Sequence, residues 1–111
     1  MDTGKFLEGQ TIYLHLTPKR AGYEAVVSIA KRWEDPPIDS ATLAVLLESE
    51  EGTLLRPTRC PPAGPLVEVG SVGATATAKL RFAAPRGVRL RRAIVILRGQ
   101  WVEFDVKEME E

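Results

Sequence analysis

Cys60 and His15 are the side chains whose chemistry comes closest to that of a catalytic pair, and each residue type occurs once in the chain. A nucleophilic cysteine needs an imidazole within hydrogen-bond reach of its sulfur and a third group that orients the base. The two residues are distant in the sequence and no third group is indicated. We therefore expect His15 to be a polar-face strand residue and Cys60 a small apolar or exposed thiol. A second hypothesis is a redox-sensitive thiol activated by Arg56 and Arg59.

Other catalytic and metal-binding motifs fail on spacing. The segment Val69–Gly73 has valine where a serine nucleophile elbow has its first glycine, and it lacks the Gly-Lys-Ser/Thr ending of a phosphate loop. The acidic run Glu48–Glu51 lacks the oxygen spacing of a calcium loop, and one histidine with one cysteine cannot form a structural zinc site. Asp35 and Asp39 have no catalytic partner in the sequence. We therefore expect a protein that is not an enzyme and that has no cofactor or metal site.

A long segment of the chain, from Gly70 to Val102, carries basic side chains and no acidic one. The whole chain balances 15 basic residues against 15 acidic ones, so the sequence predicts separate basic and acidic surfaces. If the strands that carry the basic residues are neighbours in one sheet, most of these side chains form a single patch. The predicted binding residues of this basic patch are Lys79, Arg81, Arg86, Arg89, Arg91, Arg92 and Arg98.

Three classes of function are compatible with this charge pattern. The one we favour is a protein-interaction or accessory module that docks an acidic partner protein, or another copy of itself, through a basic face, an exposed strand edge or both. The alternative is a nucleic-acid-binding domain, in which the segment 79–98 holds phosphates and Trp33 or Trp101 stacks on a base, although the chain is neutral overall. Carbohydrate binding through Trp33, Trp101 or Tyr13 is the third class. A simpler interpretation is that the arginines keep edge strands soluble.

Length and composition indicate one folded domain spanning residues 1–111. A hydrophobic content of 44% with 27% charged residues is typical of a globular protein. A single cysteine excludes an internal disulfide and fits a reducing compartment, so we expect a cytoplasmic protein. No apolar run is long enough to span a bilayer, and we expect no membrane partner. Asparagine is absent and arginine dominates the basic residues, which fits either a thermophilic source or a GC-rich genome.

Alternating apolar and polar residues predict several strands. The clearest are 11–17, ended by Pro18, then 23–33 and 74–84, and finally a hairpin of 93–97 and 101–106 that turns at Gly99. A short edge strand is expected at 66–69. Prolines make 56–65 an irregular surface loop.

The segment Ala41–Glu51 is ambiguous between a helix and a strand. Ser40 and Gly52 are suitable caps for a short helix that presents its leucines on one face. The same residues also fit a buried strand that enters a hairpin closed by Gly52. We favour the strand.

Seven or eight short strands, with at most one short helix, predict an all-β fold, a two-sheet antiparallel sandwich of immunoglobulin-like size. The segments 78–85, 93–97 and 101–106 also resemble the closing strands of bacterial immunoglobulin-like domains, over the final third of the chain. The cysteine and tryptophan signature of antibody domains is missing. This resemblance implies an immunoglobulin-like sandwich and carries no active site.

Overall fold

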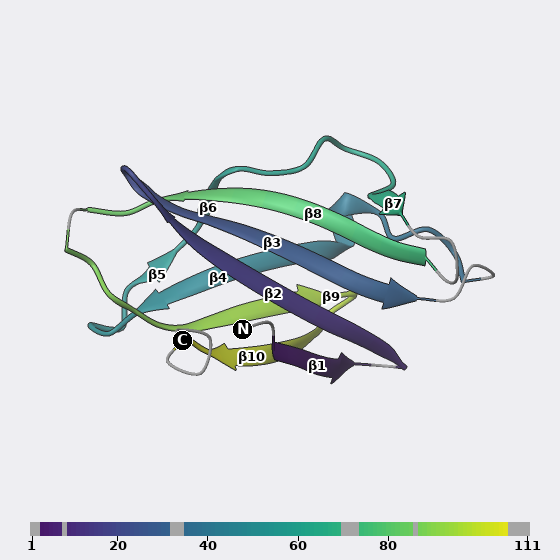
Figure 1. Cartoon of the computed structure of the whole chain (residues 1–111), viewed down its shortest axis with the longest axis horizontal. Coiled ribbons are helices and arrows are strands. Elements are labelled where there is room, and N and C mark those ends of the chain that lie inside the picture. The colour runs from purple at the N-terminus through teal and green to yellow at the C-terminus, as the bar shows by residue number, and fades with distance from the viewer. Residues whose placement is uncertain (1–2, 8, 32–34, 70–73, 86, 107–111) are drawn as a thin grey trace.

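A computed structural model of the chain describes residues 3–7, 9–31, 35–69, 74–85 and 87–106, which form two antiparallel sheets packed as a sandwich (Figure 1). The predicted all-β, two-sheet fold is confirmed. The described elements are β1 (Thr3–Leu7), β2 (Gln10–Lys19), β3 (Gly22–Lys31), a 3-10 turn η1 (Ser40–Thr42), β4 (Leu43–Ser49), β5 (Leu54–Leu55), β6 (Pro57–Arg59), β7 (Val67–Val69), β8 (Ala74–Ala83), β9 (Leu90–Leu97) and β10 (Gln100–Asp105).

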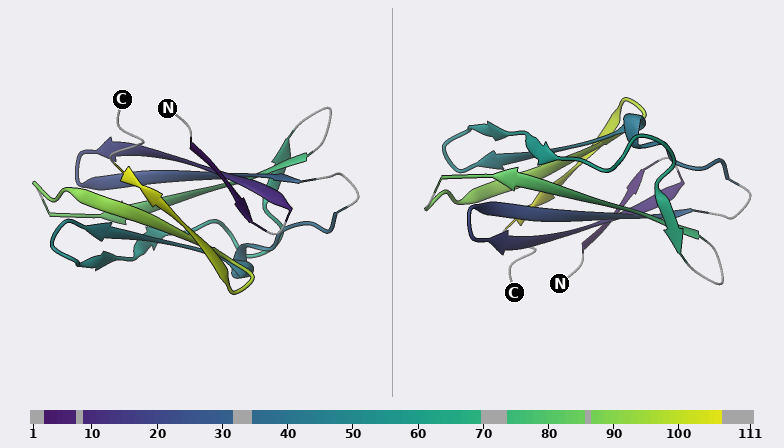
Figure 2. Two further views of the ribbon diagram at one scale, coloured as in Figure 1. Left: turned by 90° about the horizontal axis from the view of Figure 1, so that it is seen from below. Right: turned by 90° about the horizontal axis from the view of Figure 1, so that it is seen from above.

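The two sheets have different strand orders. The larger sheet runs β1-β2-β3-β8-β6, with β7 also paired to β8, and the smaller sheet runs β10-β9-β4-β5. Views turned by 90° show the strands separated into two layers (Figure 2). β1 contacts β10 of the opposite sheet along one side of the sandwich. No helix among the described residues is long and apolar enough to cross a membrane.

The core lies between the sheets and follows the alternation seen in the sequence. Every second residue is buried in the first half of β2, in β3 from Ala25 onward and in β8 from Ala76 onward, as expected for strands with one face on a core. Phe104 of β10 is the largest of the fully buried side chains. The inward rows are Ile12 and Leu14 of β2, Ala25, Val27 and Ile29 of β3, Ala76, Ala78, Leu80 and Phe82 of β8, Val45 and Leu47 of β4, and Ala93, Val95 and Leu97 of β9.

Most of the ambiguous segment 41–51 forms a strand, β4, as we predicted, after a 3-10 turn that includes residues 41 and 42. Asp39 rather than Ser40 caps the 3-10 turn that precedes β4, since its carboxylate accepts a 2.9 Å hydrogen bond from the Ala41 amide. Gly52, at φ +88°, closes the hairpin into β5, and its amide donates to the Ser49 carbonyl at 3.0 Å. Glycine suits this position because it adopts a left-handed conformation without steric cost.

Ten strands among the described residues exceed the seven or eight expected, and the additional ones lie at sheet edges. The sequence predicts no strand before residue 11, since β1 lacks a row of apolar residues: only Leu7 packs against the core, and Phe6 is 71% exposed. The prediction that 56–65 is wholly irregular was wrong, because β6 pairs with β8. An edge strand bonds on one side only and therefore accepts Pro57.

Two strand boundaries also differ from the prediction. β2 continues past Pro18 to Lys19, with Pro18 opposite Tyr23. β1 pairs only with residues 10–14 of β2, so no described strand lies along the outer edge of β2 at Pro18. The N–H group that Pro18 lacks is therefore not needed for a hydrogen bond between strands on that side. β9 begins at Leu90 rather than at residue 93, because a bulge there leaves Arg91 exposed while Leu90 is buried.

Candidate functional site

The basic patch predicted from the sequence is divided by the fold. A single patch requires the strands that carry these residues, β8 and β9, to be neighbours in one sheet. β8 belongs to the larger sheet and β9 to the smaller one. Lys79 and Arg81 are exposed on the outer face of the larger sheet, whereas Arg92 lies on the outer face of the smaller sheet. The residues therefore point to opposite sides of the sandwich.

Arg92 is held by carboxylates on both neighbouring strands. Its Nε donates to Oε1 of Glu48 on β4 at 2.8 Å, and its Nη1 donates to Oε1 of Glu103 on β10 at 2.6 Å. The hydrogen bond to Glu48 raises the pKa of the Arg92 guanidinium; desolvation opposes the shift, and the charges of Glu103 and Glu48 add to it. These contacts tie three strands together and neutralise the cation. Arg92 is thus part of a surface ion network rather than a free basic contact.

The remaining predicted residues are scattered. Arg89 lies in the connection from β8 to β9, Arg91 at the bulge, and Arg98 in the turn from β9 to β10. That turn has positive φ at Arg98 (52°) and at Gly99 (81°), the pattern of a type I′ hairpin turn. Trp33 and Arg86 lie outside the described residues, so the structure places neither of them.

A different set of basic residues is brought together at one end of the larger sheet. Lys19 at the end of β2, Arg59 of β6 and Arg81 of β8 line a hollow of about 380 Å³, which we call the cationic hollow. Sequence analysis missed Lys19, and it noted Arg59 only as a neighbour of Cys60. No local signal could identify them, because strand pairing alone joins these three segments.

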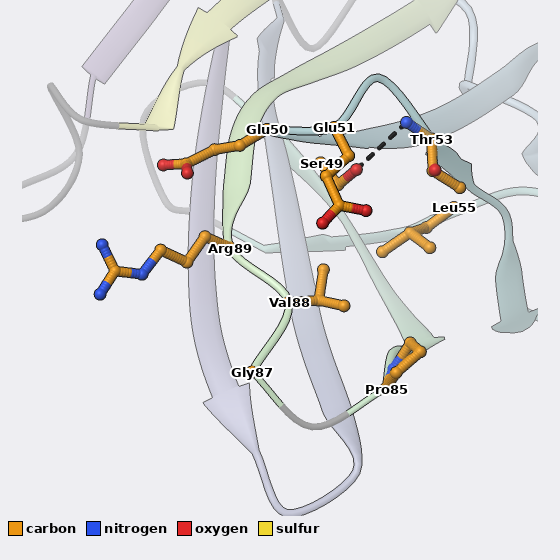
Figure 3. Close-up of a pocket in the computed structure, with 9 residues that line it drawn as sticks. All are labelled: Ser49, Glu50, Glu51, Thr53, Leu55, Pro85, Gly87, Val88 and Arg89. Carbon is orange, nitrogen blue, oxygen red and sulfur yellow. Dashed lines mark hydrogen bonds between the residues drawn. The ribbon is translucent and has the colours of Figure 1, made fainter.

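A second hollow, of about 360 Å³, lies between the β4–β5 hairpin and the connection from β8 to β9 (Figure 3). Its lining mixes apolar side chains, such as Leu55 and Val88, with acidic ones and a single arginine. The side chains of Arg89 and Glu50 extend away from Leu55 and Val88 in Figure 3. The arginine and Glu50 therefore point away from the apolar part of the hollow.

The outer face of the smaller sheet is partly apolar. Trp101 of β10 is 63% exposed and pairs across the ladder with Ile96, which in turn pairs with Ala44 of β4. In the next row, Ile94 lies opposite Leu46. β10 is also the edge strand of this sheet. We call Trp101, Ile96, Ile94, Ala44 and Leu46 the β10 face.

The structure does not bring Cys60 and His15 together as a catalytic pair. His15 is exposed on β2, and Cys60 is an exposed free thiol just after β6. β3 and β8 lie between β2 and β6 in the larger sheet, which separates the two strands by about 14 Å at normal strand spacing. Among the described residues, no group of three or more histidine, cysteine or acidic side chains could hold a metal ion.

Comparisons with protein-family models, with curated proteins and with solved structures found no match to this chain.

Proposed function

We propose that this protein is a non-catalytic interaction module that docks a partner protein through the exposed edge strand β10 and the adjoining β10 face. The observation that carries this proposal is Trp101, a large aromatic side chain that is 63% exposed on an edge strand. Tryptophan is enriched at the energetic centres of protein interfaces, because its burial removes a large apolar area from water.

The neighbourhood of Trp101 supports docking by strand addition. Within the described part of the chain, β10 pairs with β9 alone, and Lys5 of β1 lines a hollow shared with Glu103 and Asp105 at the far end of β10. The edge near Trp101 therefore presents backbone groups to an incoming strand. Ile96 lies beside the tryptophan and extends the apolar contact.

The charge of this surface changes the kind of partner we favour. The ion network compensates the charge of Arg92, and the exposed acidic residues Glu103 and Asp105 follow Trp101 on the same outer face of β10. Edge charges of this kind oppose indiscriminate pairing with other strands. They favour a partner segment that is apolar where it meets Trp101 and basic where it meets the acidic residues. The cationic hollow of a second copy of this chain could supply the basic part.

The test compares two exposed aromatic residues on edge strands of opposite sheets. Trp101→Ser and Phe6→Ser are prepared with the parent protein, and each sample is used for light scattering over a concentration series and for capture of binding proteins from a lysate. We expect Trp101→Ser to abolish self-association or partner capture and Phe6→Ser to preserve it. Equal behaviour of both variants and the parent would contradict the proposal. Thermal unfolding verifies that each variant is folded.

We also propose that the sandwich is of the immunoglobulin-like kind and comes from a bacterial protein that works in the cytoplasm. In immunoglobulin domains one sheet is ordered A-B-E-D and the other contains C, F and G. The order β2-β3-β8-β6 corresponds to A-B-E-D, and β10-β9-β4 corresponds to G-F-C, so the strand order supports the proposal. The free thiol of Cys60 supports a reducing compartment.

Nucleic-acid binding is the second candidate function. The exposed Lys79 and Arg81 on the outer face of the larger sheet favour it, because both can contact phosphates. Fluorescence anisotropy with labelled single- and double-stranded oligonucleotides over a salt series tests it. Binding that weakens steeply with salt and is lost on reversal of these two charges would support this function, and no binding at low salt would exclude it.

A further inference from the structure

We propose that the cationic hollow is a binding site for a doubly charged oxyanion, such as inorganic phosphate or a phosphomonoester group. The site lies at the end of the larger sheet formed by the β2–β3 turn and by β6 and β8, and it is distinct from the β10 face (Figure 1). The residues that carry the proposal are Lys19, Arg59 and Arg81.

The charge of the hollow is the first argument. Its lining contains three cationic side chains and no acidic one. Among the described residues, Arg81 forms an ion pair with Glu24, with 4.0 Å between its Nη1 and Oε2 of Glu24, and no ion pair involves Lys19 or Arg59. One carboxylate against three cations leaves an excess of about two positive charges. A dianionic oxyanion matches this excess.

The register of β6 is the second argument. Pro57 lies opposite Phe82, and regular pairing from there would place Arg59 opposite Leu80, whose side chain points into the core. A bulge at Thr58 instead brings Arg59 opposite Arg81. Like charges directly across a ladder are destabilising in the absence of an anion. Bulges commonly re-aim a side chain at a binding site, and this one places two arginines opposite each other in the lining of the hollow.

Small residues keep the hollow open. Ala21, Gly22 and Ala83 line it beside the longer cationic side chains. A Cβ atom at Gly22 would lie 1.8 Å from the Phe82 carbonyl oxygen, so β3 and β8 approach here as closely as backbone allows. Thr58 completes the wall, and its hydroxyl is held by donating to the Arg81 carbonyl at 3.3 Å. These small residues leave the centre of the hollow free of bulky side chains, which gives room for a compact anion between the longer cationic ones.

The test is an NMR titration of the full chain with sodium phosphate, and separately with sodium sulfate, at low ionic strength. We expect saturable amide shifts confined to residues 19–22, 58–59 and 81–83. Arg59→Gln, Arg81→Gln and Lys19→Gln should each weaken binding by about fivefold or more, as expected for loss of one partly exposed charged hydrogen bond. Because the three residues lie on different strands, misfolding of one variant leaves the others informative.

Arg98→Asn is the matched control, since Arg98 is also an exposed arginine but lies in the β9–β10 turn at the opposite end of the sandwich (Figure 1). It should leave binding unchanged. Equal weakening by this variant, or shifts spread over every basic segment, would show non-specific attraction and overturn the site. Absence of saturable binding by both anions would also overturn it. Length-dependent binding of a single-stranded oligonucleotide without binding of phosphate would replace it with nucleic-acid recognition.

Discussion

Replacement of Gly22 by alanine is expected to destabilise the protein substantially, because two backbones approach closely at this position. The added Cβ would lie 1.8 Å from the Phe82 carbonyl oxygen and 3.0 Å from the Ala83 Cα, whereas ordinary contacts begin at 3.4 Å. The strands β3 and β8 must therefore separate locally by about 1.6 Å. Neither contact is with a flexible side chain that could move aside.

The cost follows from the hydrogen bonds on each side of this contact. The Ala84 amide donates to the Ala21 carbonyl at 3.1 Å, and the pair Tyr23–Phe82 continues the ladder on the other side. Stretching two such bonds beyond useful length loses about 1 kcal/mol each, and looser packing of the buried Phe82 adds to this loss. We expect Gly22→Ala to lower the free energy of unfolding by about 2 to 3 kcal/mol.

Urea denaturation followed by circular dichroism measures the effect, with Gly52→Ala as the control. Gly52 has φ +88°, but no atom lies within 4 Å of where a Cβ would be. Its replacement by alanine should therefore lower the free energy of unfolding only through the strain of a left-handed alanine, by about 1 kcal/mol. The reasoning would be refuted if Gly22→Ala were as stable as the parent or no less stable than Gly52→Ala. A lower midpoint with an unchanged denaturant slope would support it.

Two further substitutions test the core and the last hairpin. Phe104→Ala should lower the unfolding free energy by about 3 to 5 kcal/mol, because its ring is fully buried between the sheets, whereas the exposed Phe6→Ala should change it by less than about 0.5 kcal/mol in the same denaturation assay. Arg98→Asn should raise the thermal midpoint slightly, by the equivalent of about 0.5 kcal/mol, because Arg98 has φ 52° in a type I′ turn that favours asparagine. A lower midpoint for Arg98→Asn would show that the arginine side chain makes a stabilising contact that outweighs its backbone strain.

The sequence predicted the strands that cross the core and missed the edge strands β1 and β6. Rows such as Ile12 and Leu14 alternate because one face of each long strand is buried, and this requirement can be read locally. β1 and β6 have no such row, since their stability comes from pairing with β2 and β8. Their strand character is set by the neighbouring strand rather than by their own residues.

The candidate sites were less predictable than the fold. Arg81 and Arg92 are close in sequence but belong to strands of different sheets, so a basic segment became two separate surfaces. Conversely, Lys19 and Arg59 are distant in the sequence and line the same hollow. Strand order decides these relations, and it depends on which strands pair over the whole chain. Trp101 was the predicted aromatic contact that the structure places at an exposed edge.

The bulge at Arg91 bears on which changes in chain length the fold can accept. Glu48 pairs with Arg92 and Ser49 pairs with Leu90, so Arg91 is a surplus residue in the ladder. Deleting it would leave the two flanking residues in consecutive register, with Leu90 still directed to the core. Deleting Ile94 instead would reverse the inward and outward faces of one half of β9. The strand therefore contains one position at which a deletion preserves the alternation of its side chains.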